Sequence, residues 1–88
     1  MSVGRSVVFG RGQDCDVVIP DEYASPRHAR IWQDGGGRVW VEDLGSTNGT
    51  RIFRQGSTRS EKVLGPVQLY PGDSVRIGRT VLPWRVPE

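Results

Sequence analysis

Residues 29–42, Ala-Arg-Ile-Trp-Gln-Asp-Gly-Gly-Gly-Arg-Val-Trp-Val-Glu, contain two alternating runs on either side of a glycine turn. In Ala29–Trp32 and in Val39–Glu42, apolar and polar side chains alternate with the period of two that is typical of half-buried strands. The segment Asp34–Gly37 between them has the composition of a tight hairpin turn. We therefore predict an antiparallel β-hairpin at this place in the chain.

Short apolar runs of the same kind recur along the chain, each bounded by turn residues. They are Val7–Phe9, Val17–Ile19, Arg51–Phe53, Val67–Leu69, Ser74–Ile77 and Val81–Trp84. The polar stretch from Arg54 to Lys62 is interpreted as a surface loop. Because Pro83 has no N–H to donate to a sheet, the last strand is expected at a sheet edge or at a bulge. This spacing favours an antiparallel β-sandwich, with a small β-barrel as the alternative.

The composition excludes helical and membrane-spanning folds. The 88 residues include twelve glycines and six prolines, and the longest stretches free of both are residues 27–34 and 57–64. Glycine weakens a helix interior by about 1 kcal/mol and proline by about 3 kcal/mol, so a helix of ordinary length has no place. A helical bundle, a coiled coil, a doubly wound α/β domain and a membrane span are therefore excluded. A mass of 9.8 kDa predicts one domain over residues 1–88.

Charge and cysteine content limit the classes of function. The formal net charge is +2, and Lys62 is the only lysine among twelve basic residues. This arginine excess reflects either a genome-wide bias or anion recognition, for which the planar guanidinium is well suited. A single cysteine, Cys15, excludes an intramolecular disulfide and a cysteine-rich zinc site, so no metal or other cofactor is expected. The N-terminus has no secretion signal, which predicts a cytoplasmic location.

Polar residues gather in three connections between the expected strands, Gly10–Gly12, Ser25–His28 and Gly45–Thr50. In a sandwich, the loops at one end of the sheets converge, and function concentrates there. Together the three connections would supply a guanidinium, hydroxyls, a carboxamide and backbone N–H groups, and no carboxylate. Such a set of donors suits a phosphate group. Taken singly, each connection is also explained as an ordinary turn, and His28 as a hydrogen-bonded scaffold side chain.

The order of these motifs resembles the forkhead-associated (FHA) domain. That family has Gly-Arg, then Asp or Asn before a strand, then Ser-x-x-His, and then Asp-x-x-Ser-x-Asn-Gly-Thr. The matching segments here are Gly10-Arg11, Asp16–Ile19, Ser25–His28 and Asp43–Thr50, and Gly72–Gly78 resembles the closing strands. The resemblance spans about residues 6–84. It implies an all-β antiparallel sandwich of about eleven short strands, with ligand loops at one end.

The resemblance also implies a function and a set of site residues. The chain would bind threonine-phosphorylated peptides or proteins in Ser/Thr kinase signalling, without catalysis of its own. Arg11 would pair with the phosphate, Ser25 would donate to it, and Thr47 would line the phosphothreonine pocket. Asn48 would bond the peptide backbone beside the phosphothreonine. The scaffold positions of the site would be Gly10, His28 and Gly49.

Two features depart from the family pattern. Pro26 stands where Arg, Lys or Asn is common, and it offers neither a side-chain donor nor an N–H. We hypothesise that Arg27 compensates in part, as a tentative further phosphate contact. The family also has a strand before the Gly-Arg strand, and residues 1–5 are barely long enough for one. Either the chain is a piece of a larger protein, or its first strand is short.

Three other functions compete with this interpretation. Catalysis would need a nucleophile, a base and an orienting group together, and the chain has one histidine and one cysteine. Nucleic-acid binding would need exposed aromatic residues among the basic ones, whereas Trp32 and Trp40 are explained by packing across the predicted hairpin. A protein-binding module that uses a sheet face independently of phosphate is the remaining alternative. Neither a nucleic acid nor a membrane is expected as the partner.

Overall fold

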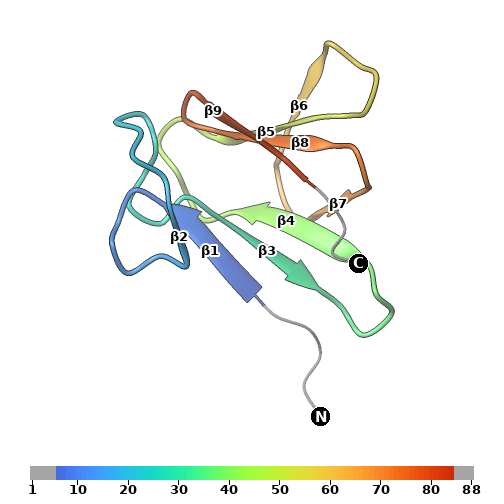
Figure 1. Ribbon diagram of the computed structural model, residues 1–88, viewed down its shortest axis with the longest axis horizontal. Helices are drawn as coiled ribbons and strands as arrows, with labels where there is room; N and C mark the ends of the chain where they lie inside the picture. Colours follow the sequence, from blue (N-terminus) through green and yellow to red (C-terminus); the bar gives the residue numbers. More distant parts are fainter. Residues whose placement is uncertain (1–5, 85–88) are drawn as a thin grey trace.

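Nine short strands make up the regular structure of residues 6–84, the part of the chain that the computed structural model describes (Figure 1). They are β1 (Ser6–Gly10), β2 (Val17–Val18), β3 (Ala29–Gln33), β4 (Val39–Asp43), β5 (Thr50–Phe53), β6 (Ser60–Lys62), β7 (Val67–Leu69), β8 (Ser74–Ile77) and β9 (Thr80–Pro83). One sheet has the order β2-β1-β3-β4-β7 and the other the order β6-β5-β8-β9. The predicted sandwich is thus confirmed, and the barrel alternative is wrong.

The predicted hairpin is present as β3 and β4. Trp32 lies opposite Trp40 in the antiparallel register, as cross-strand packing requires. The carboxylate of Asp34 organises the turn, since it accepts hydrogen bonds from the Trp40 indole and from the backbone N–H groups of Gly36 and Arg38. These bonds, the one from the Trp40 indole foremost, lower the pKa of Asp34.

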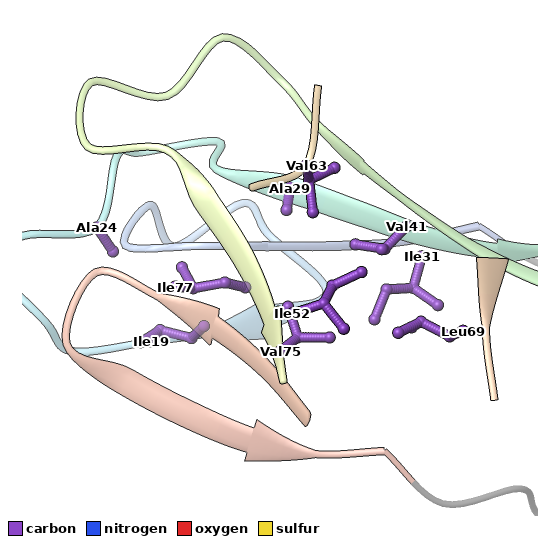
Figure 2. Close-up of a cluster of buried hydrophobic side chains, with 10 residues drawn as sticks. All are labelled: Ile19, Ala24, Ala29, Ile31, Val41, Ile52, Val63, Leu69, Val75 and Ile77. Carbon is purple, nitrogen blue, oxygen red and sulfur yellow. The ribbon is translucent and has the colours of Figure 1, made fainter. Parts of the chain in front are cut away.

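The core lies between the two sheets and is built by alternation along the strands (Figure 2). Ile31 and Val41 from the first sheet are buried against Ile52, Val75 and Ile77 from the second. On each strand, the residues next to these buried ones face outward, because successive side chains of a strand point to opposite sides of the sheet. The buried hydrophobic residues of this core, drawn in Figure 2, are Ile19, Ala24, Ala29, Ile31, Val41, Ile52, Val63, Leu69, Val75 and Ile77.

Two details of strand pairing differ from the prediction. The polar stretch predicted as a loop contains β6, an exposed three-residue strand that pairs only with β5. It has no apolar alternation because it lies at the sheet edge, where neither face is well covered. The other exception is β2, which runs parallel to β1. A six-residue connection suffices for this parallel pair because Val17 needs to reach only the level of Phe9, near the end of β1.

The last strand lies at the edge of its sheet, as the sequence predicts. Pro83 closes β9, which is an edge strand, as its missing N–H predicts. The nine strands of the described residues are fewer than the eleven that the resemblance implied. The short first strand predicted over residues 1–5 lies outside the described residues.

We predict that the Ile52→Ala substitution lowers the free energy of unfolding by about 2–5 kcal/mol, because it leaves a cavity where the two sheets meet. Urea denaturation followed by tryptophan fluorescence measures this change. The Ile52→Val variant, which removes one methyl group, should lose only about 0.5–1.5 kcal/mol. Equal losses in the two variants would contradict this position for Ile52 in the core.

Candidate functional site

The first two loops are joined by their backbones at one end of the sandwich. The N–H of Arg11 donates to the carbonyl of Ser25, and the N–H of Gly12 donates to the carbonyl of Pro26, each over 3.0 Å. This close approach requires glycine at position 10, where a Cβ atom would lie 2.4 Å from the Pro26 carbonyl oxygen. The Gly-Arg turn is therefore fixed in position against the Ser-Pro turn.

The third loop is attached to the second by side-chain contacts. The N–H of Thr47 donates to the hydroxyl oxygen of Ser25 over 3.0 Å, and the Asn48 carboxamide donates to the Tyr23 carbonyl over 2.7 Å. Ser25 is thus bonded to Arg11 through its carbonyl and to Thr47 through its hydroxyl. The structure brings these three residues, which lie far apart in the sequence, into one cluster.

The imidazole of His28 lies beneath this cluster and is fully buried. Its Nδ1 accepts the N–H of Ser25 over 2.9 Å, and its Nε2 is 2.9 Å from the Gly49 carbonyl oxygen. Since Nδ1 is an acceptor, these partners assign the tautomer in which Nε2 carries the proton and donates it. One side chain therefore connects the second loop to the third.

Asp43 organises the inside of the third loop. One carboxylate oxygen accepts the N–H groups of Gly45 and Ser46, and the other accepts the hydroxyls of Ser46 and Thr50. Burial raises the pKa of this carboxyl, but the hydrogen bonds, the Ser46 hydroxyl first among them, outweigh burial and lower the pKa on balance. Gly45 and Gly49 have φ values of +80° and +81°, which glycine adopts without strain.

Sequence reasoning missed this role of Asp43, although Asp43 belongs to the third motif. The signal was available, because an aspartate followed by a serine three residues later commonly closes a local turn through its own carboxylate. Cys15, by contrast, has the buried position expected of a lone cysteine. Its Sγ lies 2.9 Å from the Pro26 carbonyl oxygen and so contributes to the packing of the second loop.

The side chains of the cluster that face solvent are rich in hydrogen-bond donors. Arg11, Thr47 and Asn48 are exposed and Ser25 is half-buried. Among residues 6–84, no carboxylate lies within 4.0 Å of the Arg11 guanidinium. Arg27 differs, since it forms a 3.8 Å ion pair with Asp14 in which both side chains are largely exposed and the attraction is weak.

No helix within residues 6–84 is long and apolar enough to cross a membrane. The same residues contain no group of three or more His, Cys, Asp or Glu side chains placed to hold a metal ion.

The chain is similar in sequence to known proteins. The family model of the FHA domain matches residues 7–78. The FHA domain-containing protein FhaB of Mycolicibacterium smegmatis is 47% identical over 81 residues, which are 92% of this chain and 48% of that protein. The chain thus spans about half the length of this relative.

Solved structures have the same fold. A structure from a structural and functional analysis of phosphothreonine-dependent FHA domain interactions has a TM-score of 0.77 and 33% identity, covering 100% of this chain and 82% of that one. Mycobacterium tuberculosis EmbR, in complex with a low affinity phosphopeptide, also has a TM-score of 0.77, at 29% identity over 91% of this chain and 19% of that one.

We predict that the Asp43→Asn substitution lowers the free energy of unfolding by about 1–3 kcal/mol at pH 7, because donors of the third loop lose their charged acceptor. The folded pKa of Asp43 is lowered, so its contribution is complete above the unfolded value of about 3.9 and is lost as the pH falls through the folded pKa. Urea denaturation of both proteins between pH 7 and pH 2.5 measures the difference.

Lowered pKa values are also found at three other aspartates, Asp21, Asp34 and Asp73. Because both proteins contain these three, the difference in unfolding free energy between the proteins isolates the contribution of Asp43. The stability difference should therefore shrink below about pH 4. A difference that stays constant down to pH 2.5 would show that the Asp43 charge does not hold the loop.

Proposed function

The chain belongs to the FHA domain family, and we propose that it is a binding module that recognises phosphothreonine in a partner peptide or protein. The observation that supports this proposal is the cluster around Ser25, whose carbonyl accepts the Arg11 backbone N–H and whose hydroxyl oxygen accepts the Thr47 N–H. A phosphothreonine-dependent FHA structure and phosphopeptide-bound EmbR, both similar to this chain, support the same ligand class.

The exposed donors of the cluster match the chemistry of a phosphate dianion. The phosphate offers three acceptor oxygens, and the Arg11 guanidinium provides a charged fork for two of them. The Ser25 hydroxyl oxygen already accepts the Thr47 N–H, which leaves the Ser25 hydroxyl proton to donate to the phosphate. The Thr47 side chain is exposed, and we expect it to line the pocket for the phosphorylated residue.

Asn48 is proposed to bind the peptide backbone. One of its N–H bonds is used by the Tyr23 carbonyl, which fixes the orientation of the carboxamide. A second N–H and the carboxamide oxygen are left for the backbone of the ligand. An amide held in this way can pair with a peptide carbonyl and a peptide N–H, and so set the direction of the bound chain.

A preference for phosphothreonine over phosphoserine depends on one methyl group. Burial of a single methyl is worth about 0.8 kcal/mol, or roughly a factor of four in affinity. A gain of this size is preserved only where the pocket does not adjust to the smaller ligand. His28, Asp43 and the glycines with positive φ fix the loops from beneath and so provide the rigidity that this preference needs.

The site is proposed to act without catalysis. The only histidine, His28, is buried, and both of its ring nitrogens are bonded to the backbone of Ser25 and Gly49. The Ser25 hydroxyl therefore has no base in His28. We place the module in Ser/Thr kinase signalling, in the cytoplasm, where a kinase creates the phosphothreonine that the module reads.

We predict that the Arg11→Ala substitution weakens binding of a threonine-phosphorylated peptide by about 10- to 100-fold, because the phosphate loses its charged fork. Isothermal titration calorimetry with the phosphorylated peptide and its unphosphorylated twin measures the effect. Wild-type affinity should also fall as the pH drops through about 6, where the phosphate becomes a monoanion.

The Arg38→Ala variant serves as the matched control. Arg38 is exposed at the turn of the β3–β4 hairpin, and its substitution removes the same charge as Arg11→Ala does. Its affinity for the phosphorylated peptide should equal that of the wild type. If the wild type binds both peptides equally well, a phosphate-independent interface replaces this proposal.

We predict that the Arg27→Ala substitution weakens phosphopeptide binding by only about two- to fivefold, because Arg27 compensates in part for the donor that Pro26 lacks. The weak ion pair with Asp14 leaves the Arg27 guanidinium free to turn toward the phosphate. The same calorimetric titration measures this change. An unchanged affinity would mean that Arg27 makes no phosphate contact.

A further inference from the structure

One exposed threonine lies away from the cluster of the proposed site. The chain has four threonines, all within residues 6–84. Thr50 is fully buried, and the hydroxyl of Thr80 donates to a carboxylate over 2.8 Å. Thr47 belongs to the cluster itself. Thr58 is exposed in the loop Arg54–Arg59, which joins β5 to β6. Of the four threonines, Thr58 is therefore the one that a modifying enzyme reaches without opening the fold or the site.

The base of this loop is fixed, while its tip is exposed. Arg54 donates to the buried carboxylate of Asp73 over 2.7 Å at the start of the loop. At the other end, Ser60 pairs with Phe53 in the antiparallel register. Residues 55–59 between these anchors are all exposed. Loop tips of small and polar residues are the segments that proteases reach most readily, and a kinase needs the same access to the chain.

The loop lies at the end of β5 opposite the proposed site, at the upper right of Figure 1. β5 begins at Thr50, directly after the third loop of the site, and ends at Phe53, directly before Arg54. At about 3.3 Å per residue, β5 spans about 10 Å from its first residue to its last. Thr58 is two residues from Ser60, which pairs with Phe53, so its reach from Ser60 is about 7 Å. A phosphate on Thr58 therefore cannot enter the site of its own chain.

A phosphate on Thr58 would also change the charge of the molecule. The formal net charge of the chain is +2, and a phosphate monoester adds about −2 at pH 7. The net charge would then be about zero, which removes the repulsion between copies of the chain. The new negative charge would lie at one end of the sandwich, and the exposed cationic Arg11 lies at the other. Opposite charges at the two ends favour contact between the loop of one copy and the site of another.

We propose that Thr58 is a phosphorylation site, and that its phosphothreonine is bound by the site of a second copy of this chain. The inference rests on the proposed function, because the same cluster binds the phosphothreonine. A Ser/Thr kinase supplies the group from ATP. The Thr58 Oγ1 forms a bond to the γ-phosphorus, the bond from that phosphorus to the oxygen bridging it to the β-phosphorus breaks, and ADP leaves. The hydroxyl proton passes to a base of the kinase.

The position of Thr58 determines the form of the assembly. The contact joins two unlike surfaces, the loop of one copy and the site of the next, so it is heterologous. Heterologous contacts build rings or open chains of molecules, because every copy that is added brings another loop and another site. Association should therefore require phosphorylation and increase with concentration. A copy that lacks either the phosphate or a working site should end the growth.

The test compares the unphosphorylated chain with a chain that carries phosphothreonine at position 58, made by chemical ligation, in sedimentation velocity at increasing concentration. The unphosphorylated chain should remain a single 9.8 kDa species, and the phosphorylated chain should grow beyond a dimer. Arg11→Ala in the phosphorylated chain should weaken the association by about 10- to 100-fold. An equal mixture of that variant with the unphosphorylated wild type should stop at a dimer, because each partner then has only one of the two parts.

Phosphoserine at position 57 is the matched control, because the exposed Ser57 places the same charge one residue away and lacks the methyl group. Its association should be at least about fourfold weaker. Arg38→Ala in the chain phosphorylated at Thr58 should associate as that chain does. Unchanged thermal unfolding of all these proteins excludes loss of the fold as the cause of any difference.

A free phosphothreonine peptide, titrated in parallel, separates this inference from the proposed function. If the wild type binds the peptide but the phosphorylated chain stays monomeric, or associates equally well with Arg11→Ala, the second-copy contact is refuted and the proposed function stands. If neither the peptide nor the phosphorylated chain binds, both fail. A monomeric phosphorylated chain that no longer binds the peptide would mean that Thr58 occupies its own site, which also refutes the contact between copies.

The modification itself is tested by tandem mass spectrometry of the protein isolated from its own cells. Phosphate should be found on Thr58 in a fraction of the molecules. Phosphate confined to other residues, or found on none, would refute Thr58 as the modified residue.

Discussion

The buried imidazole of His28 joins the two sheets at the end of the sandwich where the loops converge. His28 directly precedes β3 of the first sheet, and Gly49, whose carbonyl it bonds, directly precedes β5 of the second. Its other nitrogen receives the N–H of Ser25, at the head of the second loop. Without this bridge, the loops that carry Ser25 and Thr47 would be tied to separate sheets. Their mutual position would then depend on weak surface contacts.

Rigid support of this kind decides what the exposed side chains can do. The carbonyl, the hydroxyl and the N–H of Ser25 each have a partner, so Ser25 has little freedom left. Asp43 fixes the third loop by accepting backbone and hydroxyl protons, and it lies beneath the loop rather than in the cluster. The exposed side chains of the cluster consequently present hydrogen-bond donors, among them the Arg11 guanidinium, which has no carboxylate within 4.0 Å among residues 6–84. Donors of this kind suit a phosphate dianion.

Two kinds of arginine with different physical roles occur among the described residues. Arg54 donates to the buried carboxylate of Asp73 over 2.7 Å, and Arg30 pairs with Glu42 across the β3–β4 hairpin. These pairs neutralise their own charge. Arg11 and Arg76 have no such partner among the described residues. Arg11 is exposed, and Arg76 lines a polar cleft together with Asn48. Some arginines of the described residues are therefore used in internal pairing, and others remain at the surface without an ion-pair partner.

Eight of the nine strands within residues 6–84, the Trp32–Trp40 hairpin and the three motif loops could be predicted from the sequence, because alternation and turn composition are local properties. It did not predict β6, whose pairing with β5 depends on a neighbour rather than on its own polar residues. Nor did it predict the role of Asp43 or the alignment of Arg51 with Arg76. These features are set by strand register and by loop contacts between distant residues. They follow from the fold as a whole, because a one-residue change of register would turn Arg51 to the other face of its sheet.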